Sequence, residues 1–374
     1  MRKSMRMRKL KAGVMLFHSA HEDRFYCGTH KRAIRIDTPE EKSLVQALAA
    51  GRAEAWDATE GDSYRSAQQG VLEKLSAVAL IDERPGVITL SKRFTSKNAQ
   101  RAEKNRDRKL DGAYQQMQNR LAPELNQSTW LDGVVDGGAS TISARQRFTV
   151  EISGSSRIAL LLYPLLLASG VTHVRFSEDF RKKSPFVGDR EIGITRFSQE
   201  DIGAPIKALC ESWRRDLSLF PIDKEIDYED TSEGADLAVH CGDIDPEIFS
   251  QWMSTGQNFL HIAEPEADRA TVGPLVIPGK SPCLRCFQLA LSDNSDIVGA
   301  TDLHPDSVRE FPVIAAHYIA SLAASQIIHF LDSINLTQRE SSELVGTVYT
   351  VDYQLLSHPE VIAIARHPLC GCAF

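Results

Sequence analysis

Four of the seven cysteines in this 374-residue chain stand in two close pairs. Cys283 and Cys286 are separated by two residues, and Cys370 and Cys372 are separated by a single glycine. Two thiolates on one tight turn can hold a tetrahedral ion, and four thiolates suit Zn²⁺ in a closed structural site. We therefore predict that the two pairs bind one structural zinc ion.

Two other interpretations of these thiols stay open. The pairs could form a redox disulfide or could be unrelated buried thiols, although clustered cysteines favour metal in a reducing compartment. Because the Cys-Gly-Cys spacing is tight, His367 could replace one cysteine ligand. The scattered cysteines Cys27, Cys210 and Cys241 are expected to be buried packing residues.

Composition and charge restrict the class of protein. A hydrophobic content of 42% and a charged content of 25% are ordinary for a soluble globular protein. The net charge of −7 gives no bias toward polyanions, so we expect no nucleic-acid partner. We find no secretory signal, and we interpret the apolar run at 313–331, which polar residues interrupt, as a buried helix. The prediction is a cytoplasmic protein without a membrane partner.

The first 91 residues predict a winged-helix-like domain. Thr38, followed by proline and two glutamates, has the pattern of a helix start. No basic recognition helix is present. The expected elements are strands at 13–17, 24–27 and 32–36, helices at 38–51 and 63–76, and a two-stranded wing formed by 78–81 and 86–90.

Residues 92–145 are polar and basic at their start, and they are expected to form linker helices. From 146 to 374 strand and helix patterns alternate, which predicts an α/β domain with a doubly wound, mostly parallel sheet. The strands expected at 347–352 and 360–365 come late in the chain and should form an antiparallel pair at the sheet edge.

The second half of the chain resembles the ThiF-type (ubiquitin-activating-like) adenylyltransferase family. Residues 271–287, which end in Pro-Cys-Leu-Arg-Cys-Phe, look like the stretch that leads to the first zinc pair of that family. Residues 367–373, His-Pro-Leu-Cys-Gly-Cys-Ala, are similar to the terminal motif of ThiF-like relatives in azole and RiPP (ribosomally synthesised, modified peptide) cyclodehydratase systems. The resemblance covers 146–374 and implies a Rossmann-like ThiF-type fold with structural zinc, in a homodimer. The N-terminal pattern is similar to the leader-peptide recognition element fused to such relatives.

The same resemblance implies a Mg-ATP site, although its phosphate-binding loop is degenerate. Active members have several glycines between the first strand and helix, where backbone N–H groups approach phosphate. Here residues 153–158 read Ser-Gly-Ser-Ser-Arg-Ile, with one glycine. Lys207 would neutralise phosphate charge and Asp243 would hold magnesium. The candidate nucleotide-binding residues are Gly154, Ser155, Arg157, Lys207 and Asp243.

Three functions fit these patterns. The first is a non-catalytic ThiF-like protein that binds a precursor or leader peptide and presents it to a modifying enzyme of the YcaO type. The second is an active ATP-dependent adenylyltransferase that activates the C-terminus of a peptide or sulfur carrier. The third is a winged-helix regulator with an α/β sensor domain. The loss of glycines favours the first function.

Overall fold

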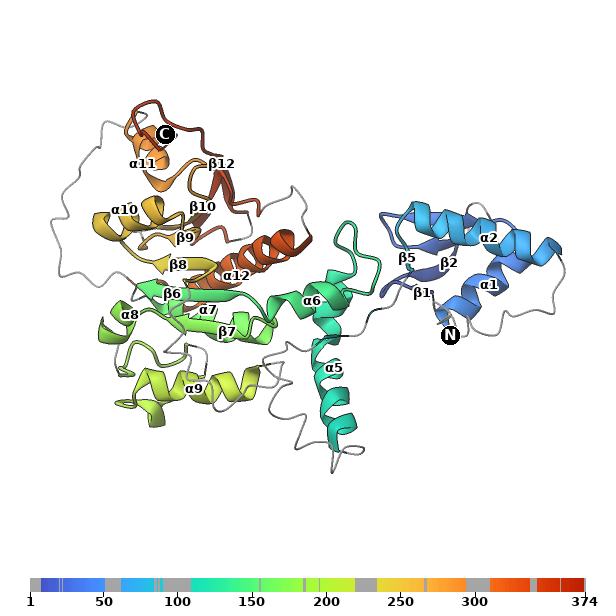
Figure 1. Ribbon diagram of the computed structural model, residues 1–374, viewed down its shortest axis with the longest axis horizontal. Coiled ribbons are helices and arrows are strands. Elements are labelled where there is room, and N and C mark those ends of the chain that lie inside the picture. Colours follow the sequence, from blue (N-terminus) through green and yellow to red (C-terminus); the bar gives the residue numbers. More distant parts are fainter. Residues whose placement is uncertain are drawn as a thin grey trace. The chain divides into compact units, whose positions relative to one another are not determined.

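The computed structural model in Figure 1 divides into two compact units, Met1–Ser143 and Ala144–Phe374. The second unit holds the candidate nucleotide and metal residues, and the first holds the expected peptide-recognition domain. The described residues are 8–19, 21, 23–50, 62–83, 86, 88–89, 109–154, 156–183, 186–194, 196–218, 234–265, 268–293, 310–336, 342–356 and 358–372.

An antiparallel three-stranded sheet and two helices form the core of the first unit (Figure 1). Alternate residues of the strands, such as Cys27 and Ile34, are buried against the helices, as the period of two predicts. Helix α1 starts as the sequence predicts, because Thr38 Oγ1 accepts a hydrogen bond from the Glu41 N–H at 3.2 Å. The elements are β2 (Met15–Ser19), β3 (Arg24–Gly28), β4 (Ala33–Ile36), α1 (Pro39–Ala49) and α2 (Asp62–Ala77).

The predicted two-stranded wing is not formed by the described residues. Strand β5 (Ile81–Asp82) pairs with β1 (Lys9–Leu10) instead of with 86–90. Residues after β5 hydrogen-bond elsewhere, since the Gly86 N–H donates to the Asp136 carbonyl (2.8 Å) and the Thr89 N–H to Ser143 Oγ (2.9 Å). The backbone groups that a wing would use are therefore engaged by a later segment of the same unit.

That later segment packs against β1 and β5. It contains α5 (Lys109–Ser128) and α6 (Ala139–Arg145). The buried Lys11 ammonium donates to the carbonyls of Thr129 (2.6 Å) and Val134 (3.0 Å). The Thr129 hydroxyl donates to the buried Asp82 carboxylate at 2.9 Å. The chain between α5 and α6 thus belongs to the core of the first unit.

The second unit is built on a seven-stranded sheet of order β12-β11-β10-β9-β8-β6-β7. The four strands β7, β6, β8 and β9 are parallel, and β10, β11 and β12 continue the sheet in antiparallel pairs. The prediction of an α/β fold around a parallel sheet is confirmed, as is the late antiparallel pair. The strands are β6 (Thr149–Gly154), β7 (His173–Phe176), β8 (Leu237–Cys241), β9 (Phe259–Ile262), β10 (Arg269–Val276), β11 (Thr347–Asp352) and β12 (Glu360–Ala363).

Helices cover both faces of this sheet. Leu237, Val239 and Cys241 of β8 join the core that contains α7 and α12, whereas Ala238 packs with side chains of α10 on the opposite face. Helix α12 is long and apolar enough to cross a membrane, but its apolar residues from Ala315 to Leu331 lie in or against this core, as the sequence predicts. The helices are α7 (Arg157–Ala168), α8 (Glu178–Lys183), α9 (Ile206–Leu217), α10 (Pro246–Thr255), α11 (Leu284–Asp293) and α12 (Val313–Leu336).

A fully buried ion pair joins α12 to the end of α6 within the second unit. Arg145 donates to both carboxylate oxygens of Asp332, from Nε at 2.9 Å and from Nη2 at 2.7 Å. A third donor, Arg145 Nη1, binds the Ser169 carbonyl after α7 at 2.7 Å. Both charged side chains are 4% exposed, so they stabilise the unit only as a pair.

Candidate metal centre and nucleotide crevice

The four predicted thiols meet at one point, although 87 residues separate the members of one contact. Cys283 and Cys286 lie at the start of α11, and the other pair follows β12. The sulfur atoms of Cys283 and Cys370 are 3.3 Å apart, and those of Cys286 and Cys372 are 3.4 Å apart. All four ligand atoms lie within 4.8 Å of one another.

This geometry fits a tetrahedral metal ion. Metal–sulfur bonds of about 2.3 Å in a regular tetrahedron give sulfur–sulfur edges of about 3.8 Å. The separation of Cys283 and Cys286 is 3.8 Å, and the two shorter contacts need only a small expansion. A cluster of four cysteines that could bind a metal ion is therefore present.

His367 is engaged beside the cluster rather than in it. Its Nε2 lies 2.8 Å from Asp293 Oδ2, and its Nδ1 accepts the Leu369 N–H at 3.2 Å. Both ring nitrogens therefore have partners, and the alternative in which His367 replaces a cysteine ligand has no support in this structure. The ring instead ties the C-terminal segment to the last residue of α11.

Hydrogen bonds to sulfur favour the thiolate form of Cys286, whereas burial favours the neutral thiols of Cys283 and Cys372. Burial raises the pKa of Cys283 above its ordinary range. Burial also raises the pKa of Cys286, but hydrogen bonds from backbone groups of His367 and Cys283 and from neighbouring thiols bring it down to about 7. A metal ion requires deprotonated thiols, and N–H donors aimed at sulfur prepare the site for that charge.

The remaining cysteines are packing residues, as predicted. Each is at most 3% exposed. Burial raises the pKa of Cys27 to about 11 and the pKa values of Cys210 and Cys241 to about 12. A thiol needs exposure and a lowered pKa to act as a nucleophile, so none of the three has the properties of one.

The carboxyl ends of β6 and β8 form the second candidate site. Strand β7 pairs with one side of β6 and β8 with the other, so chain connections diverge between β6 and β8. Such a switch point is where open α/β sheets bind ligands. Gly154 ends β6 with a φ of +87°, and a Cβ there would lie 1.8 Å from the Cys241 carbonyl oxygen. The close approach of β6 to β8 therefore requires glycine at this position, whether or not a ligand binds nearby. Ser155 lies outside the described residues.

Two buried histidines hold the turn that carries Asp243. His240 Nε2 lies 2.8 Å from the Asp243 carbonyl, and His261 Nε2 lies 2.9 Å from the Gly242 carbonyl. Nε2 of His240 must donate to the Asp243 carbonyl, and in the tautomer that carries its proton on Nε2, Nδ1 accepts from the Ser153 hydroxyl at 2.8 Å. Burial lowers the pKa of His261 to about 4, so it stays neutral. Neither histidine stands out in the sequence, because both lie inside apolar strands.

Arg157 has an acidic partner that the sequence did not indicate. It begins α7, and its Nε lies 3.6 Å from Glu310 Oε2. Its Nη1 donates to the Phe311 carbonyl at 3.2 Å. Lys207 is exposed in the first turn of α9, a helix that packs against α7. The exposed Asp243 follows β8, so it lies at the same carboxyl edge of the sheet as Gly154.

Neither a family model nor a curated protein matches this sequence. Solved structures match along nearly the whole chain. The microcin C7 biosynthetic enzyme MccB in complex with N-formylated MccA has a TM-score of 0.62 and 12% identity, covering 98% of this chain and 99% of MccB. The chain has the fold of MccB.

The other structures extend this likeness. E. coli MccB with ATP has a TM-score of 0.58 at 13% identity, again with 98% of this chain and 99% of that chain covered. PaaA has a TM-score of 0.60 at 12% identity, over 95% of this chain and 99% of PaaA. The likeness of fold to MccB covers both units, and in the second unit it agrees with the ThiF-type resemblance of the sequence.

Proposed function

We propose that this protein binds a precursor or leader peptide and presents it to a modifying enzyme. The observation that carries the proposal is the open edge of β4 in the first unit. Strand β4 ends the order β2-β3-β4, so one of its sides has no strand partner among the described residues. An extended peptide can add to such an edge through main-chain hydrogen bonds, while side-chain pockets select its sequence.

The register of the sheet identifies the open groups. The Thr29 N–H donates to the Arg32 carbonyl at 2.7 Å, and hydrogen-bonded pairs in an antiparallel ladder recur every second residue. Ile34 and Ile36 therefore bond to β3, opposite Cys27 and Phe25. The N–H and C=O groups of Ala33 and Arg35, which alternate with them, point away from β3.

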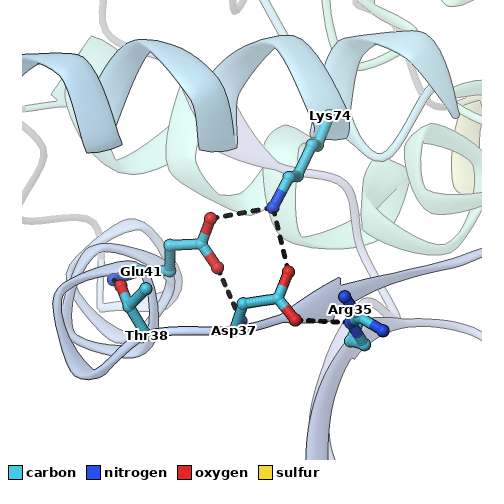
Figure 2. Close-up of polar contacts among 5 residues, drawn as sticks. All are labelled: Arg35, Asp37, Thr38, Glu41 and Lys74. Atoms are coloured by element: carbon cyan, nitrogen blue, oxygen red, sulfur yellow. Dashed lines mark hydrogen bonds and ion pairs between the residues drawn. The ribbon is translucent and has the colours of Figure 1, made fainter.

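A charged network closes one end of this edge (Figure 2). The next outward N–H, that of Asp37, donates to Glu41 Oε2 at 2.6 Å. Lys74 of α2 bridges Glu41 Oε1 (2.8 Å) and Asp37 Oδ2 (3.5 Å), and Arg35 pairs with Asp37. Burial raises the pKa of Glu41, but the bonds from Lys74 and the Asp37 N–H outweigh it and leave the pKa below its ordinary value. A bound strand would therefore pair with β4 only before Asp37.

Three further points support this function. MccB structures contain MccA, and the likeness to MccB includes the N-terminal unit. The ThiF-type resemblance implies a YcaO-type enzyme as the partner and a homodimer as the oligomeric state. The four-cysteine cluster would hold structural zinc and fix the C-terminal segment to α11.

Proline substitution on the open edge tests the proposal. Ala33→Pro removes one outward N–H and leaves the β3–β4 bonds intact, and proline is tolerated on edge strands. Fluorescence anisotropy with labelled short peptides encoded beside the gene should give saturable binding to the full chain. The variant should bind about 2- to 10-fold more weakly, the value of one hydrogen bond.

Ala33→Ser is the matched control, because it alters the side chain and keeps the N–H. Thermal unfolding of all three proteins should show that each is folded. If no such peptide binds the native protein, or if a folded Ala33→Pro variant binds as tightly as the control, the edge is not the peptide site.

A catalytic function is the second candidate, and Asp243 favours it. This carboxylate lies at the switch point of the sheet, and MccB of the same fold has been crystallised with ATP. An active adenylyltransferase would exchange pyrophosphate into ATP in the presence of its peptide, and Asp243→Asn would abolish the exchange. Exchange that depends on peptide and on Asp243 would replace the non-catalytic proposal.

A further inference from the structure

We infer that Glu310 is an internal anion that closes the start of α7 to nucleotide phosphates. This inference rests on the proposed function in one respect, the degenerate ATP site. It concerns a crevice in the second unit, whereas the proposed peptide edge lies in the first. The two can therefore be tested separately.

The start of α7 is a natural place for an anion. The helix follows β6 at the switch point, its first N–H groups have no partner within the helix, and its dipole favours negative charge. Arg157 adds a full positive charge in the first helical position. An anion that binds here would meet both the helix end and the guanidinium.

Glu310 already supplies that negative charge. Its carboxylate lies 3.6 Å from Arg157 Nε, and the neighbouring Phe311 carbonyl accepts from Arg157 Nη1. The two charged side chains are only 17% and 20% exposed. The guanidinium is therefore hydrogen-bonded to the Phe311 carbonyl and ion-paired with Glu310, although no hydrogen bond joins Arg157 Nε to Glu310 Oε2. A phosphate that bound Arg157 Nε would have to take the place of the Glu310 carboxylate.

Neighbouring charges make this displacement unfavourable. Burial raises the pKa of Glu310, the positive charges of Arg157 and Arg190 lower it, and the like charges of Glu191 and Glu264 raise it further. Glu264 follows β9 and packs 3.7 Å from the position of a Cβ on Gly242, beside the same crevice. Arg190 also acts on Glu310 and offsets part of this charge. A triphosphate that replaced Glu310 would bring several negative charges to a position on which Glu191 and Glu264 already act as like charges.

Calorimetric titration of the full-length protein with Mg-ATP tests the inference. The native protein should show no saturable binding below about 1 mM. Glu310→Gln keeps the shape of the side chain, removes its charge and frees Arg157. This variant should bind Mg-ATP at least about tenfold more tightly than the native protein. Inorganic tripolyphosphate should give the same gain, because the inference concerns the phosphates and not the base.

Two further variants make the result specific. Adding Arg157→Gln to Glu310→Gln should remove the gain, since the guanidinium would then be absent. Glu360→Gln, a charge change at an exposed position on β12, should leave binding as in the native protein. Thermal unfolding of each variant verifies that it is folded.

Two results would overturn the inference. One is native protein that binds Mg-ATP as tightly as Glu310→Gln. The other is a folded Glu310→Gln variant that binds Mg-ATP and tripolyphosphate no better than the native protein. Peptide affinity, measured by anisotropy on the same variants, should not change. A failure of the peptide proposal would appear only in the anisotropy measurement with peptide and not in the calorimetric titration with Mg-ATP.

Discussion

Loss of the Asp332 carboxylate should destabilise the second unit strongly. In Asp332→Ala, the Arg145 guanidinium loses the carboxylate that accepts from its Nε and Nη2, in a site where the native side chain is 4% exposed. Removing one partner of a buried pair leaves an uncompensated charge and costs about 3–5 kcal/mol. For a unit of this size each kcal/mol corresponds to about 2–4 °C, so Tm should fall by about 6–20 °C.

The double substitution Arg145→Met/Asp332→Leu separates charge from packing. It replaces the pair by apolar side chains of similar size, so most of the lost stability should return. Asn335→Ala is the control, because the Asn335–Arg147 hydrogen bond of 2.8 Å is exposed and should be worth about 0.5 kcal/mol or less. Circular dichroism with heat and urea measures all three. Equal Tm values for Asp332→Ala and Asn335→Ala would refute the reasoning.

Three further predictions follow from the metal cluster, the sheet and the charged network. Metal analysis should find one zinc ion per chain, and Cys370→Ser should lower the zinc content and speed proteolysis of the C-terminal segment; a native protein without metal would contradict the site. Gly154→Ala should cost at least about 3 kcal/mol in urea unfolding, because its Cβ would collide with the Cys241 carbonyl, whereas Gly256→Ala, which also has a positive φ but open space, should cost about 1 kcal/mol. Glu41 has a lowered pKa, so its contribution to the free energy of unfolding is complete above the unfolded-state pKa of about 4.3 and is lost as the pH falls through the folded-state pKa. Acid unfolding of Glu41→Gln should lack this step. An unchanged acid profile would show that the network contributes nothing to stability.

Patterns with a period predicted most of the fold. The alternation of apolar residues located β2, β3 and β4, and the βαβ alternation located β6 to β9. The paired cysteines predicted a contact between segments 87 residues apart, because a metal site requires specific residue types in a specific number. Each of these signals lies within a short stretch of sequence, even where the contact that it predicts joins distant segments of the chain.

Contacts without a local pattern were missed. Strands β1 and β5 contain two residues each, too few to show a period. The segment 78–81 was therefore expected to pair with 86–90, whereas β5 pairs with β1. Glu310 lies 153 residues after Arg157, and any of many surface glutamates could have been its partner. The sequence also could not show that Gly154 is needed for the close approach of β6 to β8. A glycine that makes room for a phosphate and a glycine that makes room for a neighbouring strand cannot be distinguished in the sequence.

The short length of the open β4 edge limits what a guest strand can gain from it. Ala33 and Arg35 offer one N–H and one C=O each, and the Glu41 carboxylate has already taken the next amide. Four hydrogen bonds give about 2–6 kcal/mol, whereas micromolar affinity requires about 8 kcal/mol. A peptide of arbitrary sequence would therefore dissociate readily, and discrimination must come from the side chains of the guest. The same brevity protects the protein from edge-to-edge polymerisation, which long flat strands invite.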